Sequence, residues 1–295
     1  METVPPVVPW PTGALTPEPT ADGSFTLFSE DFGEWFHSRE GAYTEAYTTY
    51  VEATDLTQLA QADSLRLLDV CYGLGYNTAA ALATVQRVNP QCRVHLVGLE
   101  LDSRVPKQAV AAGLVDRWPP DIQDLVAQLA DRGQVNAPPL QAELRLGDAR
   151  QTIQILADEG FQADVIFFDP FSPPHCPELW TVDFMRQVAR CLAPQGKLAT
   201  YSCAAAVRAG FLEVGLKIGP IAAAGRRWPG TLAQWSPDGL AALSQQEQEH
   251  LQTRAVVPYR DPTLRDSADI IRQRRQQEQA QSSLAPTSQW RKRWL

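Results

Sequence analysis

One short stretch constrains the fold more than any other: an apolar run that closes on a glycine turn. Leu65-Arg-Leu-Leu-Asp-Val-Cys71 leads into Gly73 and Gly75, and an alanine-rich segment follows from Asn77 to Val88. Such a run is typical of a strand that is buried on both faces, and the segment after it has helical periodicity. Strand, glycine turn and helix in this order predict the first unit of a parallel α/β sheet.

The same alternation of apolar runs and amphipathic segments continues to about residue 236. Strands separated by helices need right-handed crossovers, which place the strands parallel in one sheet. We therefore predict a doubly wound, Rossmann-like α/β fold with seven strands. Beyond the first unit, strands are expected at 93–99, 143–146, 163–168, 197–201, 216–218 and 231–235, and helices at 149–158, 182–192 and 207–214.

The sequence on either side of this core differs in character. A proline-rich start without periodicity predicts a loose leader, and an end rich in glutamine and arginine predicts an appended segment, helical from Thr263 to Gln281. Tyr43, Tyr47 and Tyr50 have the spacing of one helix face, which suggests a cap that covers the core. We expect a leader, an N-terminal cap, the α/β core and a basic C-terminal extension, with the boundaries 1–20, 21–60, 61–236 and 237–295.

Cysteine usage and apolar run length bear on where the chain works. The chain has five cysteines, an odd number, and they are scattered without a C-x-x-C pair, so reduced thiols and no zinc site are expected. The longest apolar runs, such as Ala163–Phe168, are far shorter than a bilayer requires. The start carries no basic flank followed by an apolar stretch. We therefore expect a cytoplasmic protein without a metal or a membrane attachment.

Charge is spread unevenly along the chain, whose formal net charge is −8. Residues 1–60 hold ten acidic residues and one basic residue, whereas residues 250–295 hold nine basic and four acidic residues. Such asymmetry can hide a basic surface inside an acidic total. A surface for nucleic acid and a solvated helix with a polar tail are both compatible with this pattern.

Acidic residues stand at the carboxyl ends of four expected strands: Asp69, Glu100, Asp148 and Asp169. The carboxyl ends of parallel strands meet at one edge of the sheet, where open α/β folds bind their ligands. An acid at the tip of the second strand can accept both hydroxyls of a ribose, which is the role expected for Glu100. Asp148 can hold an adenine amine, and the alternative is that it caps a helix beginning at Ala149.

The turn after the first strand favours S-adenosylmethionine (SAM) over a nicotinamide dinucleotide. Glycines let the backbone approach a ligand closely, and the helix that opens at Asn77 presents free N–H groups. The third glycine of a dinucleotide turn is missing, and Glu100 lies further along the chain than that motif predicts. The residues expected to bind SAM are Asp69, Gly73, Gly75, Asn77, Glu100, Asp148 and Asp169.

The block Asp169-Pro-Phe-Ser-Pro-Pro174 is where we expect the chemistry. A carboxylate at the end of a strand with five apolar residues among its six is costly to bury without partners, so Asp169 is expected at the open edge of the sheet. Asp169 and the carbonyl of Pro170 are the candidate catalytic groups, because their oxygens can face the positive charge that develops on the attacking atom during methyl transfer. Phe171 and Trp180 are candidate substrate-binding residues, whose rings could stack a flipped base if the resemblance described next holds; for Trp180, packing within the loop is the alternative.

At these residues the sequence resembles the methyltransferase half of the bacterial tRNA-modifying enzyme MnmC. That half uses SAM to convert 5-aminomethyl (thio)uridine at the wobble position of tRNA to the 5-methylaminomethyl form. The likeness covers about residues 20–236, and Cys71 departs from it by standing where the first glycine of the turn is usual. The matching motifs are Gly73-Leu-Gly-Tyr-Asn77, Asp169-Pro-Phe-Ser-Pro173, Trp180-Thr181 and Ala204-Ala-Ala-Val-Arg-Ala-Gly210.

This resemblance implies a SAM-dependent tRNA methyltransferase that acts on the anticodon stem-loop. It would stand alone, because no second glycine-rich nucleotide motif follows for the FAD oxidase half, and separate enzymes would form the aminomethyl group upstream. Two alternatives stay open: a transferase for a small amine or polyamine, and a non-catalytic adaptor that binds RNA or protein. The arginines expected to contact tRNA phosphates are Arg226, Arg227, Arg272 and Arg275.

Overall fold

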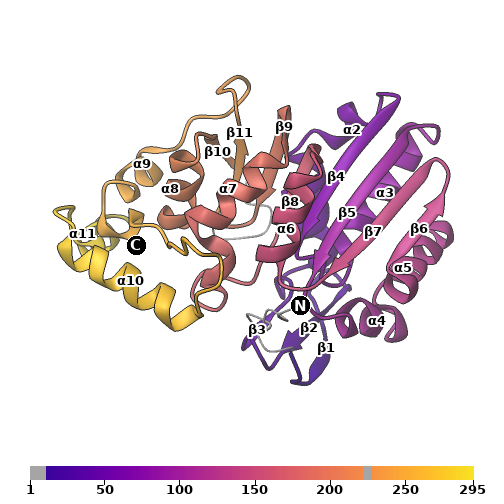
Figure 1. The fold of residues 1–295 in the computed structure, drawn as a ribbon, viewed down its shortest axis with the longest axis horizontal. Coiled ribbons are helices and arrows are strands. Elements are labelled where there is room, and N and C mark those ends of the chain that lie inside the picture. Colours follow the sequence, from indigo (N-terminus) through magenta and orange to yellow (C-terminus); the bar gives the residue numbers. More distant parts are fainter. Residues whose placement is uncertain (1–10, 222–227) are drawn as a thin grey trace, which may run out of the picture.

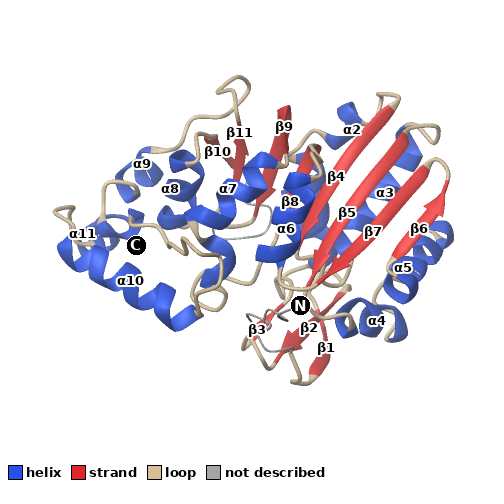
Figure 2. Ribbon diagram, viewed as in Figure 1, coloured by secondary structure: helices blue, strands red, loops and turns tan. Residues whose placement is uncertain are grey.

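The computed structural model describes residues 11–221 and 228–295. Its centre is an eight-stranded sheet in the order β10-β11-β9-β8-β4-β5-β7-β6, with helices packed on both faces (Figures 1 and 2). The strands are β4 (Ser64–Val70), β5 (Arg93–Glu100), β6 (Gln134–Ala137), β7 (Leu140–Leu146), β8 (Ala163–Phe168), β9 (Leu192–Thr200), β10 (Lys217–Ile221) and β11 (Gly230–Gln234).

The sheet confirms the predicted doubly wound α/β fold and adds one strand to it. The five central strands β9, β8, β4, β5 and β7 run parallel, and β11, β10 and β6 join antiparallel at the two sides. The unpredicted strand is β6, a short polar edge strand in which only Val135 is buried. It therefore leaves no apolar run in the sequence.

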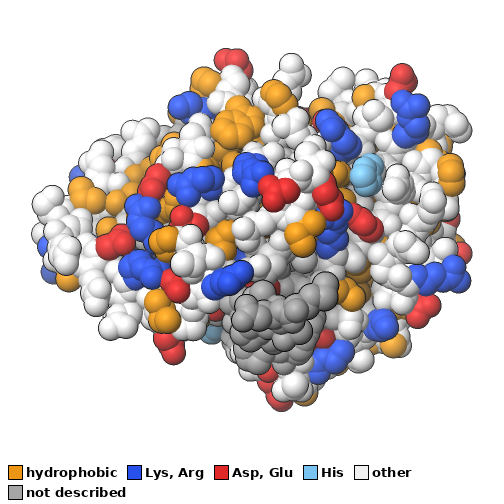
Figure 3. Space-filling model, in the orientation of Figure 1, with side chains coloured by type: hydrophobic (Ala, Val, Ile, Leu, Met, Phe, Trp, Pro, Cys, Tyr) orange, Lys and Arg blue, Asp and Glu red, His pale blue; other side chains and the backbone are white. Residues whose placement is uncertain are grey.

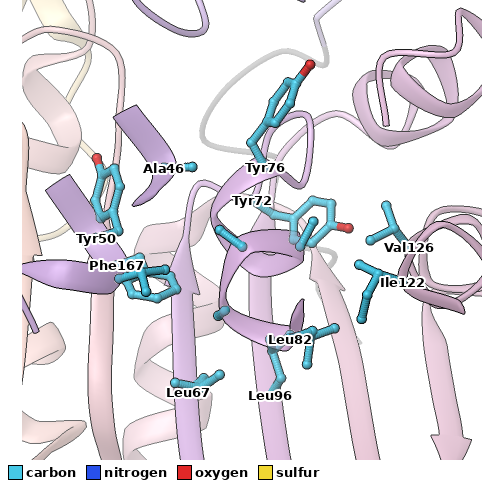
Figure 4. Packing of buried hydrophobic residues seen from close by; sticks show 14 of the residues in the cluster. Ala46, Tyr50, Leu67, Tyr72, Tyr76, Leu82, Leu96, Ile122, Val126 and Phe167 are labelled. Carbon is cyan, nitrogen blue, oxygen red and sulfur yellow. The ribbon is translucent and has the colours of Figure 1, made fainter. Parts of the chain in front are cut away.

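Two hydrophobic clusters cover opposite faces of the sheet, and alternate residues of β4 contribute to each: Leu67 to one and Leu68 to the other. The first cluster packs under α3 and α5, with Ile122 and Val126 reaching toward the strands (Figure 4). The second lies under α6, α7 and α8. The bounds of the helices around the sheet are α3 (Tyr76–Val88), α4 (Arg104–Ala111), α5 (Pro120–Arg132), α6 (Ala149–Asp158), α7 (Val182–Arg190) and α8 (Ala205–Glu213).

The N-terminal segment forms a small sheet at the carboxyl edge of the large one (Figure 1). The predicted helix is found as α1 continuing into η1, a π-helical stretch, and Tyr50 packs edge-on against Phe167 of the core. The loose leader was expected to include residues 15–19, which instead pair with β2; prolines fit there because β1 is an edge strand. The elements are β1 (Leu15–Pro19), β2 (Phe25–Ser29), β3 (Glu34–Trp35), α1 (Ala42–Glu45), η1 (Ala46–Glu52) and α2 (Leu56–Leu59).

The C-terminal extension packs on the α7–α8 side, where Tyr259, Leu264 and Ile271 join the second cluster. Its long helix begins at 268 and not at the predicted 263, because Leu264 has a left-handed φ of 54° that a helix does not accommodate. The tail docks on α9: the indole N–H of Trp290 donates to the carbonyl of Gln246 at 2.8 Å. The elements are α9 (Gln245–His250), η3 (Arg254–Val256), α10 (Ala268–Gln281) and α11 (Thr287–Trp294).

The junction between α7 and β9 also differs from the prediction. The strand begins at Leu192 and not at 197, and the Pro194-Gln-Gly196 segment lies inside it. A register shift between the pairs Ala163–Leu192 and Val165–Lys197 accommodates the additional residues. Across the described ranges, no helix is long and apolar enough to cross a membrane.

Candidate active site

Two clefts open at the carboxyl edge of the large sheet, between the strand tips and the N-terminal segment. The edge cleft is lined by the tips of β4, β5 and β7 and by the loop after β8. The side cleft is lined by residues 34–39 together with Glu45, Asp169, Pro170, Phe171 and Tyr201. Four residues line both clefts, and they are Phe36, His37, Asp169 and Phe171.

The glycine turn forms the floor of the edge cleft. Gly73 has a φ of +56°, and a Cβ there would lie 3.3 Å from the ring of Phe36, so a side chain would fill the space between turn and cap. Gly75 has a φ of +81°, and its Cβ would meet the buried Tyr72 hydroxyl at 2.6 Å. Cys71 adopts a φ of 69°, a conformation that favours glycine and explains the residue usual at this position.

Two predicted SAM ligands of the turn, Asp69 and Asn77, lie buried behind it. The Asp69 carboxylate accepts a 2.7 Å hydrogen bond from the Thr78 hydroxyl, and burial raises the pKa of Asp69 well above its ordinary value. The Asn77 amide donates to the Asp169 carboxylate at 2.9 Å. Their contacts support the turn and Asp169, so a role in SAM binding would be indirect. The predicted ligands that line the edge cleft are Gly73, Glu100, Asp148 and Asp169.

Glu100 lies at the tip of β5 with both carboxylate oxygens held by the backbone. One oxygen accepts from the N–H of Gly73 and the other from the N–H of Asp102, each at 2.8 Å. Burial raises the pKa of Glu100 to about 7, against the two backbone hydrogen bonds, which lower it. Each carboxylate oxygen can accept a further hydrogen bond, so the site suits two ribose hydroxyls.

We expect Glu100→Gln to weaken binding of the demethylated product S-adenosylhomocysteine by about tenfold or more, which is the loss of one charge-assisted hydrogen bond. The amide would also oppose one of the two backbone N–H groups with its own N–H. Titration calorimetry on the folded variant measures the effect. Glu143→Gln, on the neighbouring strand β7 where Glu143 pairs with Arg145, is the control and should bind normally. Equal affinities for both variants would exclude Glu100 from the cofactor site.

Asp148 caps α6, the alternative considered from the sequence, and it also lines the edge cleft. Its carboxylate accepts the backbone N–H of Arg150 at 2.9 Å, which is the capping contact. The Arg150 guanidinium also pairs with it at 2.8 Å. Contact with adenine stays a prediction.

Asp169 stands where the two clefts meet. Burial raises its pKa to about 6, and Tyr50 and Asn77 counteract this shift by favouring the charged form. The adjacent carbonyl of Pro170 accepts a 2.9 Å hydrogen bond from the Tyr201 hydroxyl, which fixes the backbone after β8. A carboxylate oxygen and a carbonyl oxygen thus border the side cleft together.

Phe171 lines the clefts, whereas Trp180 lies in the core. Phe171 stacks on Phe32 at 4.5 Å between ring centres and lines both clefts. Trp180 is fully buried, packs against Phe168, and donates its indole N–H to the carbonyl of Phe171 at 2.7 Å. The prediction that Trp180 stacks a base is therefore wrong. Trp180 packs within the loop, as the alternative proposed.

The predicted phosphate-binding arginines are largely committed to contacts within the chain. Arg272 donates two hydrogen bonds to the carbonyl of Pro174, at 3.2 and 2.9 Å. Arg275 donates to the carbonyls of Val257 and Ala255 and lies over the ring of Tyr259. Burial lowers the pKa of Arg275, as expected for a guanidinium withdrawn from solvent. The contacts of Arg272 and Arg275 indicate that these two side chains anchor α10, rather than bind tRNA. Arg226 and Arg227 lie outside the described residues.

The sequence reasoning missed several residues of the clefts. Glu34 accepts the backbone N–H of Ser172 at 2.8 Å and so ties the N-terminal segment to the loop after β8. Tyr201 follows β9, and its place after a parallel strand is a signal that could have identified it. The N-terminal residues carry no such signal, because their strands are short and irregular. In the part of the chain that the structure describes, His, Cys, Asp and Glu form no cluster that could hold a metal ion.

Comparison with known families agrees with this architecture. Residues 106–236 match a family model of S-adenosyl-L-methionine-dependent methyltransferases. Parallel sheet, glycine turn and acidic strand tips are the parts that such an enzyme needs for an adenosyl cofactor. The chain is a SAM-dependent methyltransferase.

Individual relatives define the family more closely. MnmC2 from Aquifex aeolicus, a crystal structure, is 30% identical; the match covers 92% of this chain and 87% of that one, with a TM-score of 0.81. An uncharacterised protein of Methanocaldococcus jannaschii is 30% identical over 260 residues, which are 85% of this chain and 69% of that protein. The chain belongs to the MnmC2 family.

The tRNA 5-methylaminomethyl-2-thiouridine biosynthesis bifunctional protein MnmC of Cupriavidus necator is also similar. It is 30% identical over 245 residues, which are 76% of this chain. The chain spans about a third of that protein's length, 35%. The relationship therefore concerns the methyltransferase part.

Proposed function

We propose that this protein transfers a methyl group from SAM to the amino group of a 5-aminomethyl uridine at the wobble position of tRNA. The observation that carries the proposal is the meeting of two clefts at Asp169. One cleft has the acidic strand tips that suit an adenosyl group, and the other opens on the far side of Asp169 and Phe171. A donor and an acceptor in these clefts would face each other across one carboxylate.

The edge cleft fits SAM by the chemistry of its lining. Glu100 would hold the ribose, Gly73 leaves the turn open for close approach, and Asp148 would face the adenine. Apolar residues such as Leu101 and Leu179 complete the lining, as a purine ring requires. When bound there, SAM supplies a methyl group on a positively charged sulfur.

The side cleft fits an amine. Three carboxyl groups line it, from Glu34, Glu45 and Asp169, and they would attract an aminomethyl group in its protonated form. For reaction the amine must be neutral and its lone pair free. Asp169 and the Pro170 carbonyl would accept N–H hydrogens and so orient that lone pair toward the edge cleft. They then stabilise the positive charge that develops on nitrogen, and the surplus proton leaves to water.

The pH dependence of methyl transfer tests the role of Asp169. The amine must lose a proton, so the rate should rise tenfold per pH unit while the amine is protonated. Asp169 must also be ionised, and its pKa is about 6. Below about pH 6 the slope of log rate against pH should therefore steepen toward two, measured in single turnovers with saturating SAM. In Asp169→Asn the steepening should vanish; a wild-type slope of one down to pH 5 would contradict the assignment.

The function itself is tested with labelled SAM and tRNA from a strain that accumulates the 5-aminomethyl nucleoside. We expect label in 5-methylaminomethyl uridine, identified by mass analysis of the nucleosides. Matched tRNA from a strain that lacks the aminomethyl group should remain unlabelled. Turnover on free polyamine without tRNA would instead favour a small-amine transferase. Tight SAM binding without transfer to any of these acceptors would favour an adaptor.

A further inference from the structure

The C-terminal extension reaches the wall of the edge cleft through a buried ion cluster. Arg150 lies between two carboxylates, Asp148 at 2.8 Å and Asp261 at 2.9 Å. The side chains of Arg150 and Asp261 are 0% exposed, and that of Asp148, which faces the cleft, is 13% exposed. Asp261 belongs to the extension, whereas Asp148 and Arg150 belong to the predicted core. A single guanidinium thus joins the two parts beside the edge cleft.

Asp261 also shapes its own loop around this guanidinium. Its other carboxylate oxygen accepts the backbone N–H groups of Arg265 and Asp266, at 3.1 and 3.2 Å. The turn so formed brings the carbonyl of Asp266 to 2.9 Å from Arg150, as a second acceptor from the extension. Leu264, at the left-handed φ of 54°, buries its side chain in the second cluster and anchors the turn. The loop therefore presents two acceptors to the Arg150 guanidinium, the Asp261 carboxylate and the Asp266 carbonyl.

Arg150 in turn leaves little freedom to Asp148. Its Nε lies 3.2 Å from both carboxylate oxygens, its Nη2 donates at 2.8 Å, and its backbone N–H makes the capping bond. Withdrawing Asp261 would leave the guanidinium with one charged partner in place of two. Because rotamers in a buried network are set by all its members, Asp148 would lose its fixed orientation.

The position of Asp148 along the sheet edge indicates which part of the ligand it would contact. Along the carboxyl edge, the order of strands is β8, β4, β5 and β7. Neighbouring strands are about 4.8 Å apart, so the tips of β8 and β7 are separated by roughly 14 Å. A ligand with its reactive end at Asp169 and its ribose at Glu100 therefore has its base at Asp148.

We propose that Asp261 is a positioning residue for the cofactor: it holds Arg150 and thereby orients Asp148 toward the exocyclic amine of adenine. This inference rests on the SAM site of the proposed function but not on the identity of the methyl acceptor. The C-terminal extension is then a working part of the nucleoside pocket. Its contribution is to cofactor affinity and base selectivity.

The test is a double-mutant cycle on S-adenosylhomocysteine affinity in the full chain. We expect Asp148→Asn and Asp261→Asn each to weaken binding by about tenfold, and the double variant to bind no more weakly than Asp148→Asn alone. Arg150→Lys keeps the positive charge but loses the planar guanidinium that bonds both carboxylates, so its affinity should be close to that of Asp261→Asn. Wild type should also bind S-inosylhomocysteine, whose base lacks the amine, about tenfold more weakly, and Asp261→Asn should discriminate less.

Glu213→Gln is the matched control, because Glu213 of α8 forms an ion pair with Arg260 of the same extension. It should bind cofactor normally, and unfolding curves of all variants show whether the fold is intact. Unchanged affinity in folded Asp261→Asn, additive losses in the double variant, or equal wild-type affinity for the two nucleosides would each overturn the proposal. These binding measurements need no tRNA, so they remain valid even if the protein is shown to methylate a different acceptor.

Discussion

Asp169→Ala should lower the rate of methyl transfer by roughly 10²–10³-fold while S-adenosylhomocysteine still binds with an affinity close to that of wild type. The size of the loss is that of removing one aligned group facing the charge of a transition state. Affinity should survive because Glu100 keeps its hydrogen bonds with the backbone of Gly73 and Asp102, which do not involve Asp169. Single-turnover kinetics at saturating SAM and calorimetry with the product measure the two quantities separately.

Asp164→Asn provides the control on the same strand. Asp164 lies near the opposite end of β8, where its carboxylate accepts the backbone N–H of Arg66 on the adjacent strand. Its loss removes a carboxylate of the same kind far from both clefts, so the rate should stay within about twofold of wild type, as for most surface changes. A rate for Asp169→Ala that matches this control would remove Asp169 from the mechanism.

Trp180→Ala should cost about 3–5 kcal/mol of the free energy of unfolding, the range for deleting a buried tryptophan. The ring is fully buried beside Phe168, and its N–H holds the carbonyl of Phe171, so the substitution leaves both a cavity and a freed loop. Urea unfolding followed by circular dichroism gives the free energy. Trp180→Phe should retain part of the packing and lose the hydrogen bond, and so lie between wild type and alanine.

Trp235→Ala is a matched comparison, because Trp235 also donates its indole N–H to a backbone carbonyl, that of Leu192, but the residue is 37% exposed. It should cost less than half as much as Trp180→Ala, since partial exposure means less apolar area is lost from contact. Similar costs for the two would show that the hydrogen bond, and not burial, dominates.

Local sequence signals predicted the sheet and the tips of its strands well. β8 was readable because its six residues are almost continuously apolar and buried. The positions of Glu100 and Asp169 at the edge of the sheet were predictable because a parallel sheet brings the carboxyl ends of its strands together, however far apart they are in the chain. The same reasoning failed for β6, where only one residue of four is buried.

Partners distant in sequence were beyond such reasoning. Arg150 and Asp261 are 111 residues apart, and no motif around either residue indicates that they form an ion pair. The arginines of α10 look available from composition, yet Arg272 reaches Pro174 across 98 residues. On the face shown in Figure 3, Lys and Arg side chains alternate with Asp and Glu, with no broad basic area. A count of charges cannot tell a free guanidinium from one that holds a carbonyl.

If the methyl donor and the methyl acceptor occupy the two clefts as proposed, the four residues common to both clefts form one wall between them. Phe36 and His37 come from the cap, and Asp169 and Phe171 from the loop after β8. A larger side chain at Phe36 would then narrow both clefts, so a change that suits a new methyl acceptor would also alter the fit of the cofactor. Relatives that change acceptor should accordingly differ in the N-terminal cap, while the glycine turn and the tips of β5 and β7 stay as they are.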